Sequence, residues 1–331
     1  MNMNLTHQSA VNSSFNPPTQ FNWRLNLIYI GQGFSVGGLN LFIAFVILRF
    51  PALRTRKEYL ILAGQTLADG CNQMAYLVSG AYSILNTVTA TQQDLTSRFT
   101  GRQCVQRPVP LSFLFTDHVA VAMLAVVSVD RLLAVSVPLD YVGWTTTYTY
   151  RLLMAAYSYS LLNGGVGLLL AFVYSNEPNF GYQCVGMMKI WSSCPLYTKH
   201  YIFSMPIIAL LSVLLYMLAV MVYMRKQKQV APAGSNNRMK WDLKQQQQFM
   251  VTVGISSLCT FCFVVLPWEV PYLRHTPIGY GIFTLNPLAN VLIYPLRQSC
   301  IRKGVRALVS CKHMPEDLKL WTMATDQNKA S

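Results

Sequence analysis

Residues 200–224 read HYIFSMPIIALLSVLLYMLAVMVYM and contain no Asp, Glu, Lys or Arg. A helix needs about 20 apolar residues to cross the hydrocarbon core of a bilayer, and this stretch is long enough. Backbone polar groups cannot stay unpaired in lipid, so such a stretch must be helical. Because the alternation typical of membrane strands is absent, the sequence predicts helical spans and not a barrel.

The rest of the chain repeats this pattern. Of its 331 residues, 53% are hydrophobic and 11% are charged, against roughly 25% charged residues in soluble domains. We therefore expect an all-α membrane protein, a bundle of seven transmembrane helices. The predicted spans are residues 25–48, 59–84, 108–130, 152–174, 200–224, 249–268 and 275–295. Residues 1–24 would precede this 25–295 domain, and residues 296–331 would form a tail.

The distribution of basic residues predicts the orientation. The connections on the tail side hold 19 Lys and Arg residues, and the opposite side holds 7. Since basic residues favour the cytoplasmic side, the tail is cytoplasmic and the N-terminal segment extracellular. The net charge of +14 raises nucleic acid as a partner, but the basic residues flank apolar runs. Membrane lipids with anionic head groups are therefore the expected partners, and nucleic acid is not.

Both chain ends carry candidate modification sites. Asn4 and Asn12 lie in N-x-[ST] sequons of the outer segment, which shows no cleavable signal peptide. After the last span, Ile301, Val305, Leu308 and Val309 share one helical face and Arg302, Lys303 and Arg306 the other. That pattern predicts an amphipathic helix in the membrane interface. Cys300 and Cys311 flank it and are candidates for palmitoylation, with free thiols as the alternative.

Polar residues inside the spans predict an interior network. Asp69 shares one face of the second span with Gln65, Asn72 and Gln73. The first span offers Asn40, and the seventh offers Asn286, Asn290 and Tyr294. These residues either bond the helices together or form a hydrated ion site that changes between two helix arrangements.

The third span carries a second acidic residue. Asp117 is adjacent to His118, so the two side chains diverge on a helix, and we expect one of them to face the bundle cavity. The alternatives are a ligand contact and a buried acid paired with a neighbouring hydroxyl. Gly33 with Gly37, and the cluster Gly164, Gly165 and Gly167, predict close helix approach.

The eight cysteines suggest a disulfide and no metal site. Cys104, Cys184 and Cys194 fall on the outer, oxidising side, and the pairing of Cys104 stays open between the other two. Cys259 and Cys262 form a C-x-x-C inside the sixth span, where we expect small core residues. No catalytic or nucleotide-binding motif occurs, so we expect neither an enzyme nor a cofactor.

Several short motifs occur in a fixed order along the chain. Ser128-Val129-Asp130-Arg131-Leu132 and Pro138-Leu139-Asp140-Tyr141 resemble the D-R-Y…P-L-x-Y stretch of rhodopsin-like G-protein-coupled receptors. Gly38-Leu39-Asn40 and Leu67-Ala68-Asp69 resemble that family's first-span and second-span segments. The run from Asn290 to Arg297 resembles its N-P-x-x-Y stretch, and Cys104 matches its outer disulfide cysteine.

Departures from these motifs narrow the resemblance. Leu132 replaces the usual Tyr, Val291 the usual Pro, and Val264-Val265-Leu266-Pro267 is the nearest match to the sixth-span C-W-x-P. With a very short third outer loop, the chain is most similar to nematode serpentine chemoreceptors of the srsx-like class. The resemblance implies a plasma-membrane receptor, in a sensory neuron's cilium, for a small-molecule or peptide ligand, with a heterotrimeric G protein as partner.

The resemblance also implies a mechanism. Phe113, Asp117 and His118 would belong to the ligand pocket, and Phe113 stands where amine receptors carry an Asp. Ligand binding would release Arg131 from Asp130, a pair we expect to be partly wet and weak, and Asn290 and Tyr294 would belong to the same switch. Asp242 is a second candidate partner for Arg131 in the resting state. A transporter or channel, an intramembrane enzyme and a non-signalling receptor-like protein are the competing interpretations.

Overall fold

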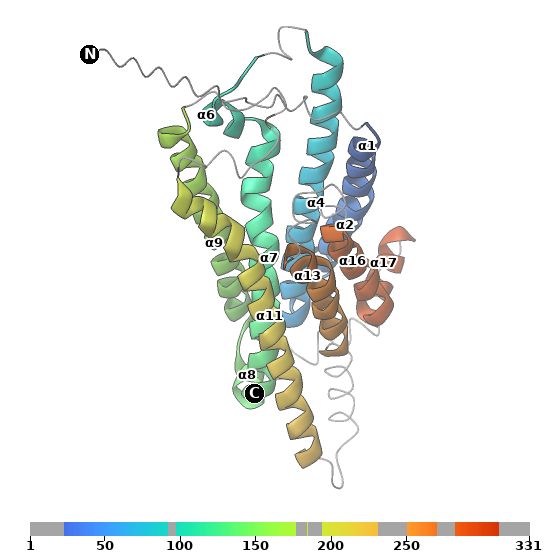
Figure 1. Ribbon diagram of the computed structural model, residues 1–331. Coiled ribbons are helices and arrows are strands. Elements are labelled where there is room, and N and C mark those ends of the chain that lie inside the picture. The colour runs from blue at the N-terminus through green and yellow to red at the C-terminus, as the bar shows by residue number, and fades with distance from the viewer. Residues whose placement is uncertain are drawn as a thin grey trace, which may run out of the picture.

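The structure is a computed structural model that describes residues 23–91, 97–176, 184, 194–230, 250–269 and 282–310. Over these ranges the regular elements are helices arranged in an elongated bundle (Figure 1). Asn4, Asn12, Asp242 and Cys311, which the sequence analysis singled out, lie outside the described residues.

The helices follow the apolar pattern of the sequence. Their bounds are α1 Trp23–Gln32, the π-helix η1 Gly33–Gly37, α2 Gly38–Arg49, α3 Pro51–Arg54, α4 Lys57–Thr89, α6 Gly101–Val105, α7 Pro108–Ser136, α8 Pro138–Gly143, α9 Thr146–Tyr174, α11 Pro195–Val230, the π-helix η2 Phe261–Val265, α13 Leu266–Glu269, α16 Leu285–Arg297 and α17 Ser299–Val309. Residues 250–260 are also helical and run directly into η2.

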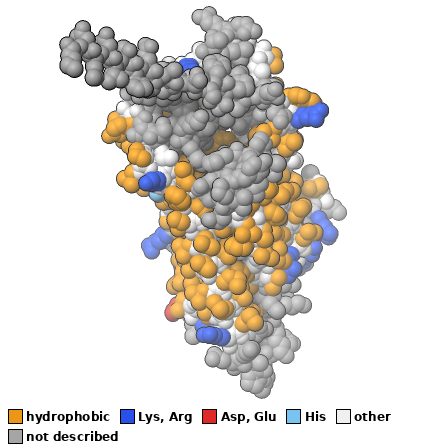
Figure 2. All heavy atoms as spheres, viewed as in Figure 1, with side chains coloured by type: hydrophobic (Ala, Val, Ile, Leu, Met, Phe, Trp, Pro, Cys, Tyr) orange, Lys and Arg blue, Asp and Glu red, His pale blue; other side chains and the backbone are white. Residues whose placement is uncertain are grey.

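Four helical stretches are long and apolar enough to cross a membrane. They are Trp23–Arg49, Pro108–Ser136, Thr146–Tyr174 and Pro195–Lys226, and a shorter apolar helix covers Met250–Val265. The all-helical prediction is thus confirmed over the described residues, together with four of the predicted spans. Hydrophobic side chains cover most of the visible flank of the bundle, as a lipid-facing surface requires (Figure 2).

The helices extend beyond several predicted ends. The predicted spans stop at Asp130 and begin at residue 152, whereas α7 runs on to Ser136 and α9 starts at Thr146. Hydropathy marks only the part of a helix that lies in hydrocarbon, while backbone hydrogen bonding continues past it. For the seventh span, predicted at 275–295, residues up to 281 lie outside the described ranges and α16 continues to Arg297.

α7 lies in the middle of the bundle between α4, α9 and α11 (Figure 1). Small residues let its neighbours approach. A Cβ at Gly164 of α9 would come within 2.5 Å of the Phe115 ring, and one at Gly167 would collide with the Tyr197 hydroxyl. A Cβ at Gly33 would sit 2.6 Å from the Gln73 carbonyl oxygen of α4. The close approach predicted from these glycines is present, except at Gly165, where no atom lies within 4 Å.

A disulfide ties the short helix α6 to Cys184. α6 begins with a capping box, in which the Thr100 hydroxyl accepts from the Gln103 N–H and the Gln103 side chain accepts from the Thr100 N–H. Cys104, in the last turn of α6, bonds to Cys184, and Cys194 is free. Of the two pairings that the sequence left open, the structure contains Cys104–Cys184.

The predicted amphipathic helix is α17. Ile301 is fully buried against the core of α2, α3 and α4, while Arg302, Lys303 and Arg306 are exposed. Val309, assigned to the same apolar face, is 71% exposed, so it does not pack against the rest of the protein. Cys262 also differs from its predicted core position, because it points out of the bundle from η2.

Candidate functional site

The clearest polar cluster lies near the end of α7. Arg131 Nε donates to Asp130 Oδ2 at 3.0 Å, and Nη2 contacts the same oxygen. The Tyr141 hydroxyl, from α8, donates to Asp130 Oδ1 at 3.0 Å and lies 3.4 Å from Arg131 Nη2. One carboxylate is therefore shared by a guanidinium and a phenol.

This cluster is buried, which corrects one expectation. The ion pair was expected to be partly wet, but Arg131 is 3% exposed and Asp130 is 0% exposed. The expectation failed because it treated the connection after α7 as solvent-exposed chain, whereas α8 folds back and places Tyr141 over the pair. Removing one partner of a buried pair costs about 3–5 kcal/mol, so this pair cannot be treated as a weak surface contact.

Tyr141 is itself held in place by Lys57, the first residue of α4. Lys57 Nζ donates to the Tyr141 backbone carbonyl and lies 4.1 Å from the centroid of its ring. Burial raises the pKa of Tyr141, so the hydroxyl stays protonated and able to donate to Asp130. The P-L-x-Y resemblance pointed to Tyr141, but nothing in the sequence pattern pointed to Lys57.

A second cluster surrounds Asp69 in the middle of the bundle. Gln65 Nε2 and Asn290 Nδ2 each donate to the Asp69 carboxylate at 3.0 Å, so α4 and α16 are joined through one acid. Asn290 Oδ1 accepts from the Ser256 hydroxyl at 2.5 Å. All four side chains are buried. The structure thus brings the predicted residues of the second and seventh spans together.

Two residues of this network were missed in the sequence. Ser256 and Thr260 stand four residues apart, and Thr260 Oγ1 donates to Asn286 Oδ1 at 3.0 Å. Both hydroxyls therefore bond residues of α16. The spacing of four on one apolar helix was the available signal, but Ser and Thr are common in spans and do not stand out as acids do.

Asn40 and Tyr294 lie at the edges of this network. Asn40 Nδ2 donates within its own helix to Val36 O at 3.0 Å and lies 3.4 Å from the Pro287 carbonyl. Tyr294 is buried in the core that also holds Tyr59 and Val291. Gln73 is buried, and its Oε1 has no partner.

A partly open cavity is lined by residues of both clusters. Its walls come from α4, α7, α11 and the helix that begins at Met250, and its lining includes Gln65, Ser256, Thr260, Ser128 and Arg131. Gln65 Oε1 is buried without a partner at one end of this cavity. Polar groups therefore follow one another from the Asp69 cluster to the Arg131 cluster through a space that a change in helix packing would reshape.

The predicted pocket residues lie in the other half of α7. The Asp117 carboxylate accepts from the Tyr201 hydroxyl at 2.9 Å, and Asn72 of α4 is within hydrogen-bonding reach of it. His118 is buried, with Nε2 3.3 Å from the Ser204 hydroxyl. Phe113 packs edge-on against Tyr76 at 4.9 Å. The three residues thus contact different neighbours: Phe113 contacts α4, His118 contacts α11, and Asp117 lies between these two helices.

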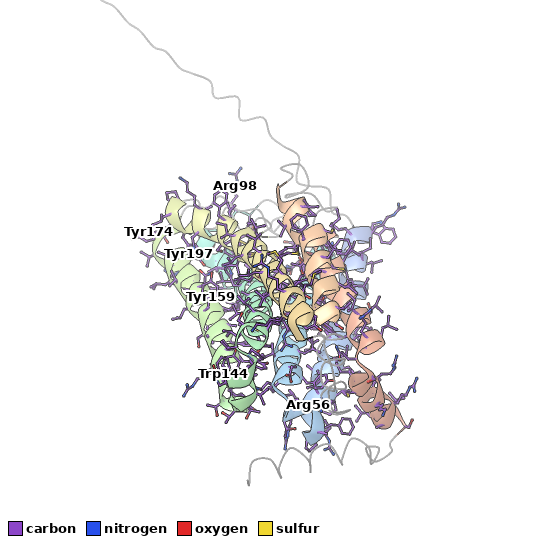
Figure 3. All side chains as sticks on the ribbon, turned by 90° about the horizontal axis from the view of Figure 1, so that it is seen from below. Arg56, Arg98, Trp144, Tyr159, Tyr174 and Tyr197 are labelled. Atoms are coloured by element: carbon purple, nitrogen blue, oxygen red, sulfur yellow. A yellow bond between two sulfur atoms is a disulfide. The ribbon has the colours of Figure 1, made fainter. Side chains whose placement is uncertain are left out.

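Aromatic and polar side chains surround this half of the bundle. Tyr159 and Tyr197 lie near one another on α9 and α11 in Figure 3, and Trp144 lies well apart from them. His118 faces Tyr159 at 6.1 Å and Tyr201 at 5.0 Å between ring centroids. Within the described residues no group of three or more metal-binding side chains occurs. The chemistry available here is hydrogen bonding and ring contact.

Comparison with known proteins identifies the class. Residues 34–276 match the family model described as serpentine type 7TM GPCR chemoreceptor Srsx, while a search of curated proteins found no match. The matched region covers most of the chain and includes α7 with Arg131 and α11. The chain belongs to this family of nematode serpentine chemoreceptors, a receptor class that is not an enzyme class.

Proposed function

We propose that the chain is a G-protein-coupled receptor for an external small ligand, with seven crossings, an extracellular N-terminus and a cytoplasmic tail. The observation that supports it most strongly is the buried cluster of Asp130, Arg131 and Tyr141 at the end of α7. A cationic side chain buried in a span is costly to keep. Arg131 is kept here beside Asp130, and a conformational change could separate the two side chains.

The ligand would bind in the half of the bundle around Phe113, Asp117 and His118. It can shift the receptor only by binding one helix arrangement more tightly than the other. Asp117 already joins α7 to α11 through Tyr201, so a ligand that competes for this carboxylate changes how the two helices pack. Phe113 stands beside it and adds a hydrophobic contact.

The change would reach Arg131 through the polar interior. Ser256 and Thr260 bond α16, and Asn290 bonds Asp69, so movement of these helices breaks specific hydrogen bonds. The cavity between the two clusters gives the side chains space to rearrange. Arg131 would then exchange Asp130 for a group on a heterotrimeric G protein. This is a two-state switch, and the hydrated ion site expected near Asp69 is part of the same proposal.

The remaining expectations extend the proposal. The receptor would lie in the plasma membrane, in the cilium of a sensory neuron, with α17 in the membrane interface and its basic face toward anionic lipid. Cys300, half-buried next to α4, and Cys311 are the candidate palmitoylation sites. Asn4 and Asn12 are the candidate glycosylation sites.

The test combines a ligand screen with two variants. Cells that carry the chain, a promiscuous G protein and a calcium reporter are screened with small molecules and peptides. Arg131→Ala should abolish the evoked signal. Because that change leaves Asp130 buried without its cation, the double variant Asp130→Asn with Arg131→Ala serves as a matched control without a buried charge. Both variants should reach the surface and stay silent, and an undiminished signal in the double variant would refute the mechanism.

A transporter or channel is the alternative function. The cavity between α4, α7 and α11, with its hydroxyl lining, is the observation in its favour. Ligand-dependent current or uptake in cells without a matching G protein would support it. A receptor-like protein that does not signal remains the third candidate, and surface delivery with silence toward every ligand and G protein would support that one.

A further inference from the structure

The last carbonyl groups of α7 have an unusual partner. A helix leaves its final four carbonyl oxygens without an N–H from the same helix, and they carry a partial negative charge. In α7 two of these groups belong to Val135 and Ser136, the last two residues of the helix. Lys226 Nζ donates to both of them, at 2.8 Å each.

Lys226 comes from a different helix, near the end of α11. Its ammonium therefore joins α11 to α7 at the place where α7 ends. The two helices also share a hydrophobic contact there, since Val135 packs in one cluster with Tyr216 and Ala219. That hydrophobic contact tolerates sliding, whereas one ammonium shared by two backbone carbonyls fixes a position.

The segment that Lys226 contacts lies next to the residues of the proposed switch, Arg131 and Tyr141. Val135 and Ser136 follow Arg131 by about one turn, and Tyr141, which caps Asp130, comes five residues after Ser136. Lys57 holds the far side of Tyr141 from α4. The turn after α7 is thus bracketed by two lysines on helices at either side, both of which donate to backbone carbonyls. Of these, only Lys226 belongs to α11, one of the helices whose packing the proposed ligand would change.

We infer that Lys226 is a positioning residue that locks the resting arrangement of α7 and α11. This inference rests on the proposed function, because the lock matters only if the helices move during signalling. Outward movement of the end of α11 separates the ammonium from both carbonyls, and the turn that carries Tyr141 is then free to release Asp130. The lock uses backbone acceptors, so no acidic residue of another span is needed for it.

The experiment compares Lys226→Gln with a neighbour. Arg225→Gln removes the same charge one residue earlier, at an exposed position, and Lys226→Arg keeps charge and donors. Ligand-independent nucleotide exchange on a promiscuous G protein is measured in membranes and normalised to receptor amount. Lys226→Gln should raise it about three- to tenfold, the size expected for a partly exposed bond to a charged donor. Arg225→Gln and Lys226→Arg should stay near the parent level.

A second readout does not depend on coupling. Hydrogen exchange of amides in residues 133–143 should accelerate in Lys226→Gln and not in Arg225→Gln, because the end of α7 loses its cap. If Lys226→Gln does not reach the membrane, Lys226→Ala with the same exchange measurement replaces it. The inference would be overturned if Lys226→Gln and Arg225→Gln showed the same ligand-independent nucleotide exchange and the same amide hydrogen exchange. Coupling that survives Arg131→Ala would instead reject the proposed function, so the two failures can be told apart.

Discussion

At the scale of single residues, the proposed function depends on how the charge of Arg131 is kept inside the bundle. Arg131 is buried, but its partner Asp130 has a second donor in Tyr141, so the carboxylate is satisfied on both oxygens. A buried pair contributes little net stability when complete and costs much when broken. The pair is therefore better understood as a device that selects one arrangement than as a source of stability.

Tyr141→Phe isolates the phenol. The variant keeps the ring that lies against Lys57 and removes only the hydroxyl that donates to Asp130. A hydrogen bond to a charged group is worth about 1.5–3 kcal/mol, so the resting arrangement should weaken by an amount near the lower end of that range. We expect higher basal G-protein activation, measured as ligand-independent nucleotide exchange. Tyr150→Phe, at an exposed position on α9, is the control, and the same basal activation in both variants would contradict this role.

The sequence predicted those site residues whose polar side chains are energetically costly to place inside a membrane span. Acids and amides in an apolar span stand out, so Asp69 and Asn290 could be selected in advance, and the structure places them next to each other. Arg131 was selected through the resemblance to the D-R-Y motif. Lys57 and Lys226 could not be selected, because a lysine at a span end is ordinary. Their acceptors are backbone carbonyls, which are present at every residue and leave no mark in the sequence.

At the scale of elements, the helices are held by both close backbone contact and polar bonds. Gly33 lies in the π-helix η1, where the first span contacts α4. A π-helical turn inside an α-helix widens the backbone and changes which face meets the neighbour. Without a hydrophobic driving force between helices in lipid, such contacts carry much of the association energy.

Gly33→Ala tests this contact, and the same span offers a control. The added Cβ would lie 2.6 Å from Gln73 O and Leu77 N, so α4 has to shift, at about 1–3 kcal/mol for an overpacked site. At Gly38 no atom lies within 4 Å of the added Cβ. We expect Gly33→Ala to lower the thermal unfolding midpoint of purified receptor and Gly38→Ala to leave it unchanged or raise it. Equal midpoints for the two variants would show that the approach at Gly33 is not a tight contact.

Hydropathy predicts helices well and their ends poorly. The first, third, fourth and fifth spans coincide with helices that are long and apolar enough to cross a membrane. α4 is the instructive exception, because its 33 residues include Gln65, Asp69 and Gln73, which lower its mean hydropathy. Those side chains face the interior, where Asp69 bonds Gln65 and Asn290 of α16. Hydropathy averaged over a window of residues cannot distinguish the helix face that points into the bundle from the face that contacts lipid. The spacing of the polar residues along the helix can.

At the scale of the whole molecule, three polar clusters lie at different depths of one bundle. The Asp117 cluster, the Asp69 network and the Arg131 cluster are buried polar groups along α7 and its neighbours, and one cavity is lined by residues of the last two. Close packing between helices holds the bundle together, and the buried polar clusters limit the helix arrangements in which every polar group is paired. A molecule with a few such arrangements is suited to switching between them, which is the property that the proposed function requires.

The last prediction concerns the side of the membrane on which each end of the chain lies. The proposed odd number of crossings would put the chain ends on opposite sides, and 19 basic residues against 7 predict that the tail is cytoplasmic. An epitope tag at the N-terminus should be stained on intact cells, and a tag after Ser331 only after permeabilisation. The double variant Asn4→Gln with Asn12→Gln should remove both glycans and increase the mobility of the N-tagged chain, and each single variant should produce a smaller shift. The disulfide between Cys104 and Cys184 fits the same orientation, since that half of the bundle would face the oxidising side. Staining of both tags on intact cells would show an even number of crossings, and Arg131 could then not meet a cytoplasmic G protein in the way proposed.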